Sequence, residues 1–277
     1  MTKEEIQNQI IQAVETVRRT NPMVGSITNT VTINFVANAQ LAVGGSAAMV
    51  YLPDEGESLA KAGGATYINV GTLLPIYEQT LPHVAKVLHD TGKPWVLDPV
   101  AVGVGLLRTQ LLRRFKEYKP DVIRGNASEI IALAGLWELD GGTALSKVRG
   151  VDSTDSVNAA KTAAVALAKW TGGAVAVSGK TDLITDGSVI AFSHGGSHFM
   201  EKITGSGCSL GGVVAVYATA ASPFIAALTA AAVYNLAGNR AENQVNGPGS
   251  FQRQFLDELY KATAADIANN PFEIEEV

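Results

Sequence analysis

Short apolar runs alternate with longer stretches of helical periodicity along the middle of the chain, and this alternation constrains the fold most. The runs that predict buried strands are residues 65–70, 94–98, 121–124 and 174–179. The stretches that predict helices are residues 81–90, 107–118, 126–135 and 156–170. Such alternation indicates βαβ units and a mostly parallel sheet with helices on both faces. No linker or repeat divides the sequence, so a single α/β domain over residues 1–277 is expected.

Two segments break this pattern. Asp186-Gly187 lies between two apolar runs within residues 182–192, which predicts a β-hairpin. Residues 138–156 are polar and glycine-rich and predict a mobile loop.

At the N-terminus, Thr2 and Glu5 form a capping-box pattern before a helical apolar face, and no signal-peptide core follows.

Composition excludes several classes of protein. Hydrophobic residues make up 47% of the chain, which is enough for a large core and argues against disorder. The formal net charge is −5 and no basic tract occurs, which argues against nucleic-acid binding. A single cysteine cannot form an internal disulfide, so a reducing cytoplasm is the expected location.

No charged residue occurs between Lys202 and Arg240. A membrane span is the less favoured interpretation, because the stretch is rich in small residues and Ser222-Pro223 interrupts it. Two helices buried in the core, or against a partner subunit, are expected instead.

Polar and small residues follow each predicted strand. They are Gly71-Thr72, Asp98-Pro99, the segment 124–129 and Ser178-Gly179-Lys180. In open parallel sheets, ligands bind at the carboxyl ends of the strands. The sequence therefore predicts a site at this edge of the sheet.

The segment "TGSGC", Thr204 to Cys208, precedes a long apolar helix. Glycines at a helix start let backbone N–H groups converge on an anion such as a phosphoryl group. A plain helix-starting turn is the alternative. A thiol at a helix N-terminus tends to have a lowered pKa, so Cys208 could act as a base or a nucleophile. A small buried apolar side chain is the alternative, and most free cysteines are of that kind.

Two carboxylates, Asp98 and Glu129, are expected at neighbouring strand ends, where they could hold Mg²⁺. A turn cap and a helix first-turn acid are the alternatives. Arg124 could grip phosphates or form a surface ion pair. The four histidines show no metal-ligand spacing, and Ser178 lacks the setting of a hydrolase nucleophile.

Taken together, these stretches resemble the hydroxyethylthiazole kinases of thiamine salvage, within the ribokinase-like superfamily. The segments that carry the resemblance are 26–38, 46–49, 69–73, 97–103, 123–130, 177–182, 204–208 and 247–251. The family phosphorylates the primary alcohol of 4-methyl-5-(2-hydroxyethyl)thiazole with ATP and Mg²⁺. The resemblance therefore implies a ribokinase-like fold without a β-lid.

The resemblance also implies a role for individual residues. Those implied to bind ATP are Arg124, Asn126, Ser178 and Thr204. Asp98 and Glu129 would serve the metal. Those implied to border the thiazole are Asn29, Val31, Met49, Gly71 and Gly205. Those implied to act in catalysis are Gly205 and Gly207, which line the anion cradle, and Cys208, which stands where most of the superfamily has an aspartate.

Gly25 and the stretch 46–49 depart from the family pattern beside the expected pocket, which leaves the exact alcohol open. The resemblance further implies a homotrimer in which the Asn29–Met49 region meets a neighbouring subunit. Two other readings remain: a hydroxymethylpyrimidine kinase or related ribokinase-like enzyme, and a non-catalytic vitamin-precursor binding protein.

Overall fold

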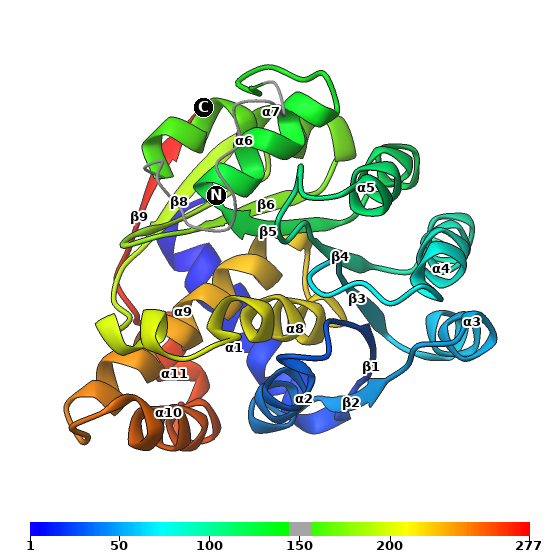
Figure 1. The fold of residues 1–277 in the computed structure, drawn as a ribbon. Coiled ribbons are helices and arrows are strands. Elements are labelled where there is room, and N and C mark those ends of the chain that lie inside the picture. The colour runs from blue at the N-terminus through cyan, green and yellow to red at the C-terminus, as the bar shows by residue number, and fades with distance from the viewer. Residues whose placement is uncertain (144–156) are drawn as a thin grey trace.

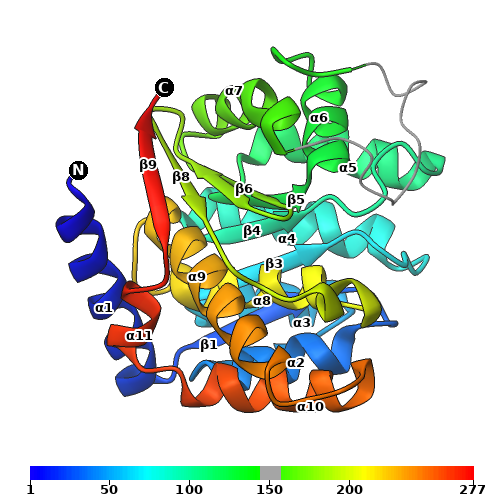
Figure 2. The same cartoon turned by 90° about the vertical axis from the view of Figure 1, so that its left-hand side faces the viewer.

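The computed structural model describes residues 1–143 and 157–277. Within them, nine strands form one sheet in the order β2-β1-β3-β4-β5-β6-β7-β8-β9, with helices on both faces (Figures 1 and 2). The expected α/β fold with a mostly parallel sheet is confirmed. The predicted loop at 138–156 lies largely outside the described residues.

The strands are β1 (Met23–Ile27), β2 (Ser46–Met49), β3 (Ala65–Asn69), β4 (Trp95–Asp98), β5 (Val122–Asn126), β6 (Ala174–Ser178), β7 (Asp182–Thr185), β8 (Val189–Ser193) and β9 (Phe272–Glu276). The α-helices are α1 (Lys3–Thr20), α2 (Ile33–Ala42), α3 (Pro53–Ala62), α4 (Tyr77–Thr91), α5 (Leu106–Tyr118), α6 (Ala127–Leu136), α7 (Lys161–Thr171), α8 (Ser206–Ala218), α9 (Pro223–Glu242), α10 (Pro248–Lys261) and α11 (Ala264–Ala268). Two 3-10 helices are η2 (Val157–Ala160) and η3 (His198–Lys202).

Strands β1 to β6 pair in parallel, whereas β6 to β9 pair antiparallel. The four predicted parallel strands correspond to β3, β4, β5 and β6. The predicted hairpin is β7–β8, and its turn has Gly187 at a φ of 89° with Asp186 accepting hydrogen bonds from the backbone N–H groups of Ser188 and Val189. Strands β1, β2 and β9 were not predicted.

The core has one half on each face of the sheet. Helices α1, α2, α8, α9, α10 and α11 contribute to one buried cluster, and helices α3 to α7 contribute to the other. Strand β1 and strands β3 to β8 supply residues to both clusters; Tyr67 of β3 belongs to the first and Ile68 to the second. Strands buried on both faces explain the near-continuous apolar runs seen in the sequence.

The long uncharged segment forms two helices, α8 and α9, which Pro223 separates by starting the second. Both helices are buried over most of their surface, as expected for helices that are apolar all round. In the described part of the chain, no helix is long and apolar enough to cross a membrane.

The carboxyl ends of β3, β4, β5 and β6 lie side by side at one edge of the sheet. Asn69 is in register with Asp98, and Asn126 is in register with Ser178. Helix α8 packs across β3 and β4 and brings its N-terminus to the same edge (Figure 1). The fold therefore gathers the polar strand ends beneath the start of one helix.

Candidate active site

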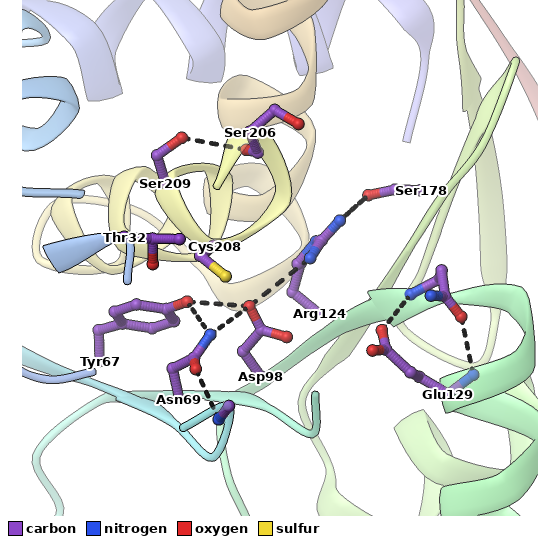
Figure 3. A network of polar contacts seen from close by, with 12 residues as sticks. Thr32, Tyr67, Asn69, Asp98, Arg124, Glu129, Ser178, Ser206, Cys208 and Ser209 are labelled. Carbon is purple, nitrogen blue, oxygen red and sulfur yellow. Dashed lines mark hydrogen bonds and ion pairs between the residues drawn. The ribbon is translucent and has the colours of Figure 1, made fainter. Parts of the chain in front are cut away.

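Asp98, the last residue of β4, is the centre of the polar network at this edge (Figure 3). Its Oδ2 atom accepts a hydrogen bond from the Tyr67 hydroxyl at 2.8 Å and one from the Asn69 amide at 3.0 Å. The Arg124 guanidinium lies 3.5 Å from the same oxygen. One carboxylate oxygen is thus held from three sides.

The other oxygen of Asp98, Oδ1, is buried and has no partner among the described residues. A buried carboxylate oxygen without a hydrogen bond is costly, and a water, an ion or a catalytic role can account for it. Burial raises the pKa of Asp98, while Arg124, Tyr67 and Asn69 stabilise its charged form. Burial also raises the pKa of Tyr67 well above its ordinary value, so its hydroxyl stays a donor.

Arg124 of β5 joins two strand ends. Besides its contact with Asp98, it donates to the Ser178 Oγ from Nε at 3.2 Å and from a terminal nitrogen at 2.8 Å. The residue is 7% exposed, so its charge acts in a low dielectric. A Cβ at Gly207 would lie 2.6 Å from the guanidinium, so only glycine allows α8 to approach this closely.

The predicted glycine turn forms the first residues of α8. Gly205 is the N-cap and has a φ of 91°, a conformation that favours glycine. A Cβ at Gly205 would lie 2.8 Å from the Cβ of Thr32. Helix geometry leaves the first N–H groups of α8 without intrahelical partners. Cys208, in the same turn, lies near Asp98 and Arg124 in Figure 3. This arrangement suits a phosphoryl group.

Cys208 is the third residue of α8 and projects toward Asp98 and Tyr67 (Figure 3). Its Sγ accepts a hydrogen bond from the Asn29 amide at 3.4 Å. The expectation of a lowered thiol pKa is wrong: burial raises the pKa of Cys208, and the negative charge of Asp98 raises it further. These two effects exceed the attraction of Arg124. The resting thiol is protonated at neutral pH.

Glu129 lies in the first turn of α6 and forms a capping box with Asn126. Its Oε2 accepts from the Asn126 N–H at 2.9 Å, and its Oε1 accepts from the Ala101 N–H at 3.3 Å. Burial and the nearby charge of Asp98 raise the pKa of Glu129 to about 7. Both oxygens already accept backbone hydrogen bonds, one from Ala101 in the loop after β4 and one from the N-cap Asn126. The interpretation of Glu129 as an acid in the first turn of a helix therefore describes this residue well.

The remaining predicted residues border the network. Asn29 is buried and donates to the Asn69 Oδ1 at 3.1 Å, and the Gly71 N–H donates to the same oxygen at 2.9 Å. Met49 is half-buried at the end of β2, and Thr204 is exposed before the glycine turn. Val31 is 64% exposed and does not belong to the network.

Gly25, which departs from the family pattern, lies in the middle of β1. It pairs with Thr66 of β3, on the sheet face opposite Tyr67, and a Cβ there would lie 3.2 Å from the Leu59 side chain of α3. This departure from the family pattern therefore concerns the packing of α3 and not the network around Asp98.

Sequence reasoning missed Tyr67, Asn69 and Thr32. Asn69 ends a predicted strand next to Asp98, so the rule about strand ends could have found it. Tyr67 lies two residues earlier on the same face. Only the structure shows that its hydroxyl reaches Asp98. Within residues 1–143 and 157–277, no group of three or more His, Cys, Asp or Glu residues is arranged to hold a metal.

Comparison with known proteins agrees with this geometry. The model of the hydroxyethylthiazole kinase family matches residues 14–265. The chain belongs to the hydroxyethylthiazole kinase family. It is 50% identical to a hydroxyethylthiazole kinase of Bifidobacterium animalis subsp. lactis over 96% of this chain and 91% of that protein. It is 44% identical to one of Cereibacter sphaeroides over 89% of this chain and 91% of that protein.

Solved structures agree with this family assignment. The chain is 29% identical to the hydroxyethylthiazole kinase of Pyrococcus horikoshii, with a TM-score of 0.84 over 98% of this chain and 99% of that one. A pyridoxal kinase of Staphylococcus aureus shares the fold at 18% identity, with a TM-score of 0.59 over 92% of this chain and 99% of that one. Neither a hydroxymethylpyrimidine kinase nor a binding protein is favoured by these comparisons.

The raised pKa of Cys208 predicts its alkylation behaviour. Because the thiolate is the reactive form, the rate of reaction with iodoacetamide should reach half its maximum at a higher pH than for a free cysteine peptide. Asp98→Asn removes the repelling charge, so its midpoint should move to lower pH. Mass spectrometry across a pH series measures both, since the chain has one cysteine. A wild-type midpoint at or below that of the peptide would contradict this electrostatic account.

Proposed function

We propose that the chain transfers the γ-phosphoryl group of ATP to the primary alcohol of 4-methyl-5-(2-hydroxyethyl)thiazole, as in thiamine salvage. The observation that supports this most is Asp98: one oxygen has three polar neighbours, and the other is bare beneath a glycine-rich helix start. Phosphoryl transfer depends on positioning and on charge stabilisation, and this edge of the sheet offers both.

Arg124 and the start of α8 would bind the phosphate groups of ATP. The guanidinium and the first N–H groups of α8 would stabilise the charge that spreads over the phosphoryl oxygens. Ser178 and Asn126 end the neighbouring strands β6 and β5, where they border the nucleotide, and Thr204 lies at the entrance to the turn. Gly205 and Gly207 let the backbone approach without a side chain between.

Mg²⁺ fits the site through Asp98, whose unpartnered Oδ1 is a hard oxygen ligand. Glu129 would act through water, because both of its oxygens accept backbone hydrogen bonds. Water and phosphate oxygens would complete the coordination, as is usual for this ion. The ion supplies positive charge to the phosphate oxygens.

The acceptor alcohol would lie near Cys208, bordered by Asn29, Gly71, Met49 and Gly205. The Asn29 amide donates to the Sγ of Cys208 and to the Asn69 Oδ1, and the Asn69 amide in turn donates to Asp98. In a loose transition state the alcohol loses its proton late. The protonated thiol would therefore orient the hydroxyl, and the proton of the alcohol would pass to an oxygen of the transferred phosphoryl group as the new bond forms.

The proposal extends to assembly and location. The exposed side chains of Val31 and Leu41, at 64% and 54%, fit the idea that the Asn29–Met49 region meets a neighbouring subunit in a homotrimer. In that assembly Val31 would border the thiazole. We also propose that residues 1–277 form one kinase domain and that it works in the cytoplasm. A fully active monomer in sedimentation would contradict the shared site.

The substrate assignment predicts the outcome of an acceptor panel. The purified protein with ATP and Mg²⁺ should phosphorylate 4-methyl-5-(2-hydroxyethyl)thiazole with a kcat/KM at least about tenfold above that for hydroxymethylpyrimidine, a typical margin for a pocket built around one ring. Product mass and ADP release measure this. Equal or greater turnover of the pyrimidine would overturn the assignment, and ADP release without any acceptor would argue for an ATPase.

The close approach of α8 to Arg124 predicts a second result. Gly207→Ala places a methyl group 2.6 Å from a guanidinium nitrogen, so it should lower kcat/KM for ATP at least about tenfold by displacing Arg124. Gly249→Ala is the matched control. Gly249 is likewise the second residue of a helix, α10, but it has nothing within 4 Å of its added Cβ. Wild-type kinetics in Gly207→Ala would contradict the role of this contact.

A further inference from the structure

Asp182 is a buried carboxylate that the proposed chemistry does not use. It begins β7 and is 8% exposed. Its Oδ1 accepts from the Gly179 N–H at 3.0 Å, and its Oδ2 accepts from the Asn235 side-chain amide at 3.0 Å. Burial raises the pKa of Asp182, whereas these two N–H donors and Arg124 favour its charged form. Burying a carboxylate is costly unless it is hydrogen-bonded, and Asp182 meets this condition through these two donors.

The turn between β6 and β7 is the segment that Asp182 holds, through the Gly179 N–H. Gly179 and Lys180 are exposed, and Gly179 lies close to the Val157 side chain of η2. Ser178, the residue before Gly179, receives the two hydrogen bonds from Arg124 (Figure 3). By fixing the Gly179 N–H, Asp182 fixes the backbone on which the Ser178 hydroxyl stands.

Asn235 of α9 supports this carboxylate from the opposite side. Its amide nitrogen donates to Asp182 and also to the Ser193 Oγ at the end of β8, both at 3.0 Å. Its backbone oxygen accepts from the Gly196 N–H at 2.9 Å, in the segment that leads to η3 and the glycine turn. Asn235 is 6% exposed, so these bonds are shielded from water.

We infer that Asp182 and Asn235 are positioning residues for the nucleotide half of the site, acting through Ser178 on Arg124. This rests on the proposed binding of ATP by Arg124 and Ser178. The pair does not touch the acceptor side, where Asn29 and Cys208 stand. Its loss should therefore weaken ATP binding and leave the thiazole side unchanged.

The test is Asp182→Asn, measured as KM for each substrate, kcat, and ADP affinity by calorimetry. An amide has one acceptor oxygen where the carboxylate offers two, so both contacts at residue 182 are kept only if the Asn235 amide reverses, and that reversal gives up its donor bond to the Ser193 Oγ. KM for ATP and the Kd for ADP should rise about tenfold, with KM for the thiazole alcohol and kcat within about twofold. Asn235→Ser removes the amide donor to Asp182 together with its bond to the Ser193 Oγ and leaves Asp182 itself in place. It should raise both ATP values about threefold and serves if Asp182→Asn does not fold.

Two further variants sharpen the result. The exchange Asp182→Asn with Asn235→Asp restores a donor–acceptor pair between these positions and should recover most of the ATP affinity. Asn270→Ala is the control: Asn270 donates to the Ser193 Oγ and to the His194 oxygen from the far side of the same cluster. It should lower the melting temperature without changing KM for ATP.

The outcomes separate cleanly. An unchanged KM for ATP in folded Asp182→Asn, or in Asn235→Ser if the first does not fold, would overturn the inference. So would an equal rise in KM for both substrates, or an equal effect of Asn270→Ala, since each is the mark of a general structural role. Failure of the wild-type protein to bind ADP or to phosphorylate the thiazole alcohol would overturn the proposed function instead.

Discussion

The burial of the Asp98 carboxylate at the end of β4 is the constraint on which the site depends. A charged group in that position needs close partners, and Tyr67, Asn69 and Arg124 all contact the same oxygen. All three side chains belong to strands of the sheet, so the strands hold them in place around Asp98. The consequence is a second oxygen held in a fixed direction without a partner of its own. Preorganised charge of this kind is what phosphoryl transfer requires.

Glycines let helix α8 complete the site. Gly207 admits the Arg124 guanidinium, Gly211 admits the Tyr67 ring, and Gly205 turns the chain into the helix beside Thr32. The same approach brings Cys208 close to Asp98, which makes the thiol harder to ionise than its helix position alone would suggest. Burial of the thiol is the larger cause of its raised pKa, and the negative charge of Asp98 adds to it.

The sequence predicts much of the fold because β3, β4, β5 and β6 are buried on both faces and read as apolar runs. Strands β1 and β2 escaped detection because Gly25 and the alanines of 46–49 have weak strand propensity. Strand β9 escaped it because glutamates alternate along an edge strand. The strand-end rule found Asp98, Arg124 and Ser178. It did not reveal the hydrogen bond from Tyr67 to Asp98 or the one from the Gly179 N–H to Asp182. Both depend on side-chain directions that only tertiary packing fixes.

The central claim is that Asp98 offers its unpartnered oxygen to the metal–phosphate complex. The most direct measurement is a crystal structure with Mn²⁺ in place of Mg²⁺, together with ADP and the thiazole alcohol, in which anomalous scattering locates the ion. The account predicts the peak bound to Asp98 Oδ1 or one water away from it, with Arg124 and the first turn of α8 on the phosphates. A nucleotide-bound ion that contacts neither Asp98 nor a water held by it would contradict the account.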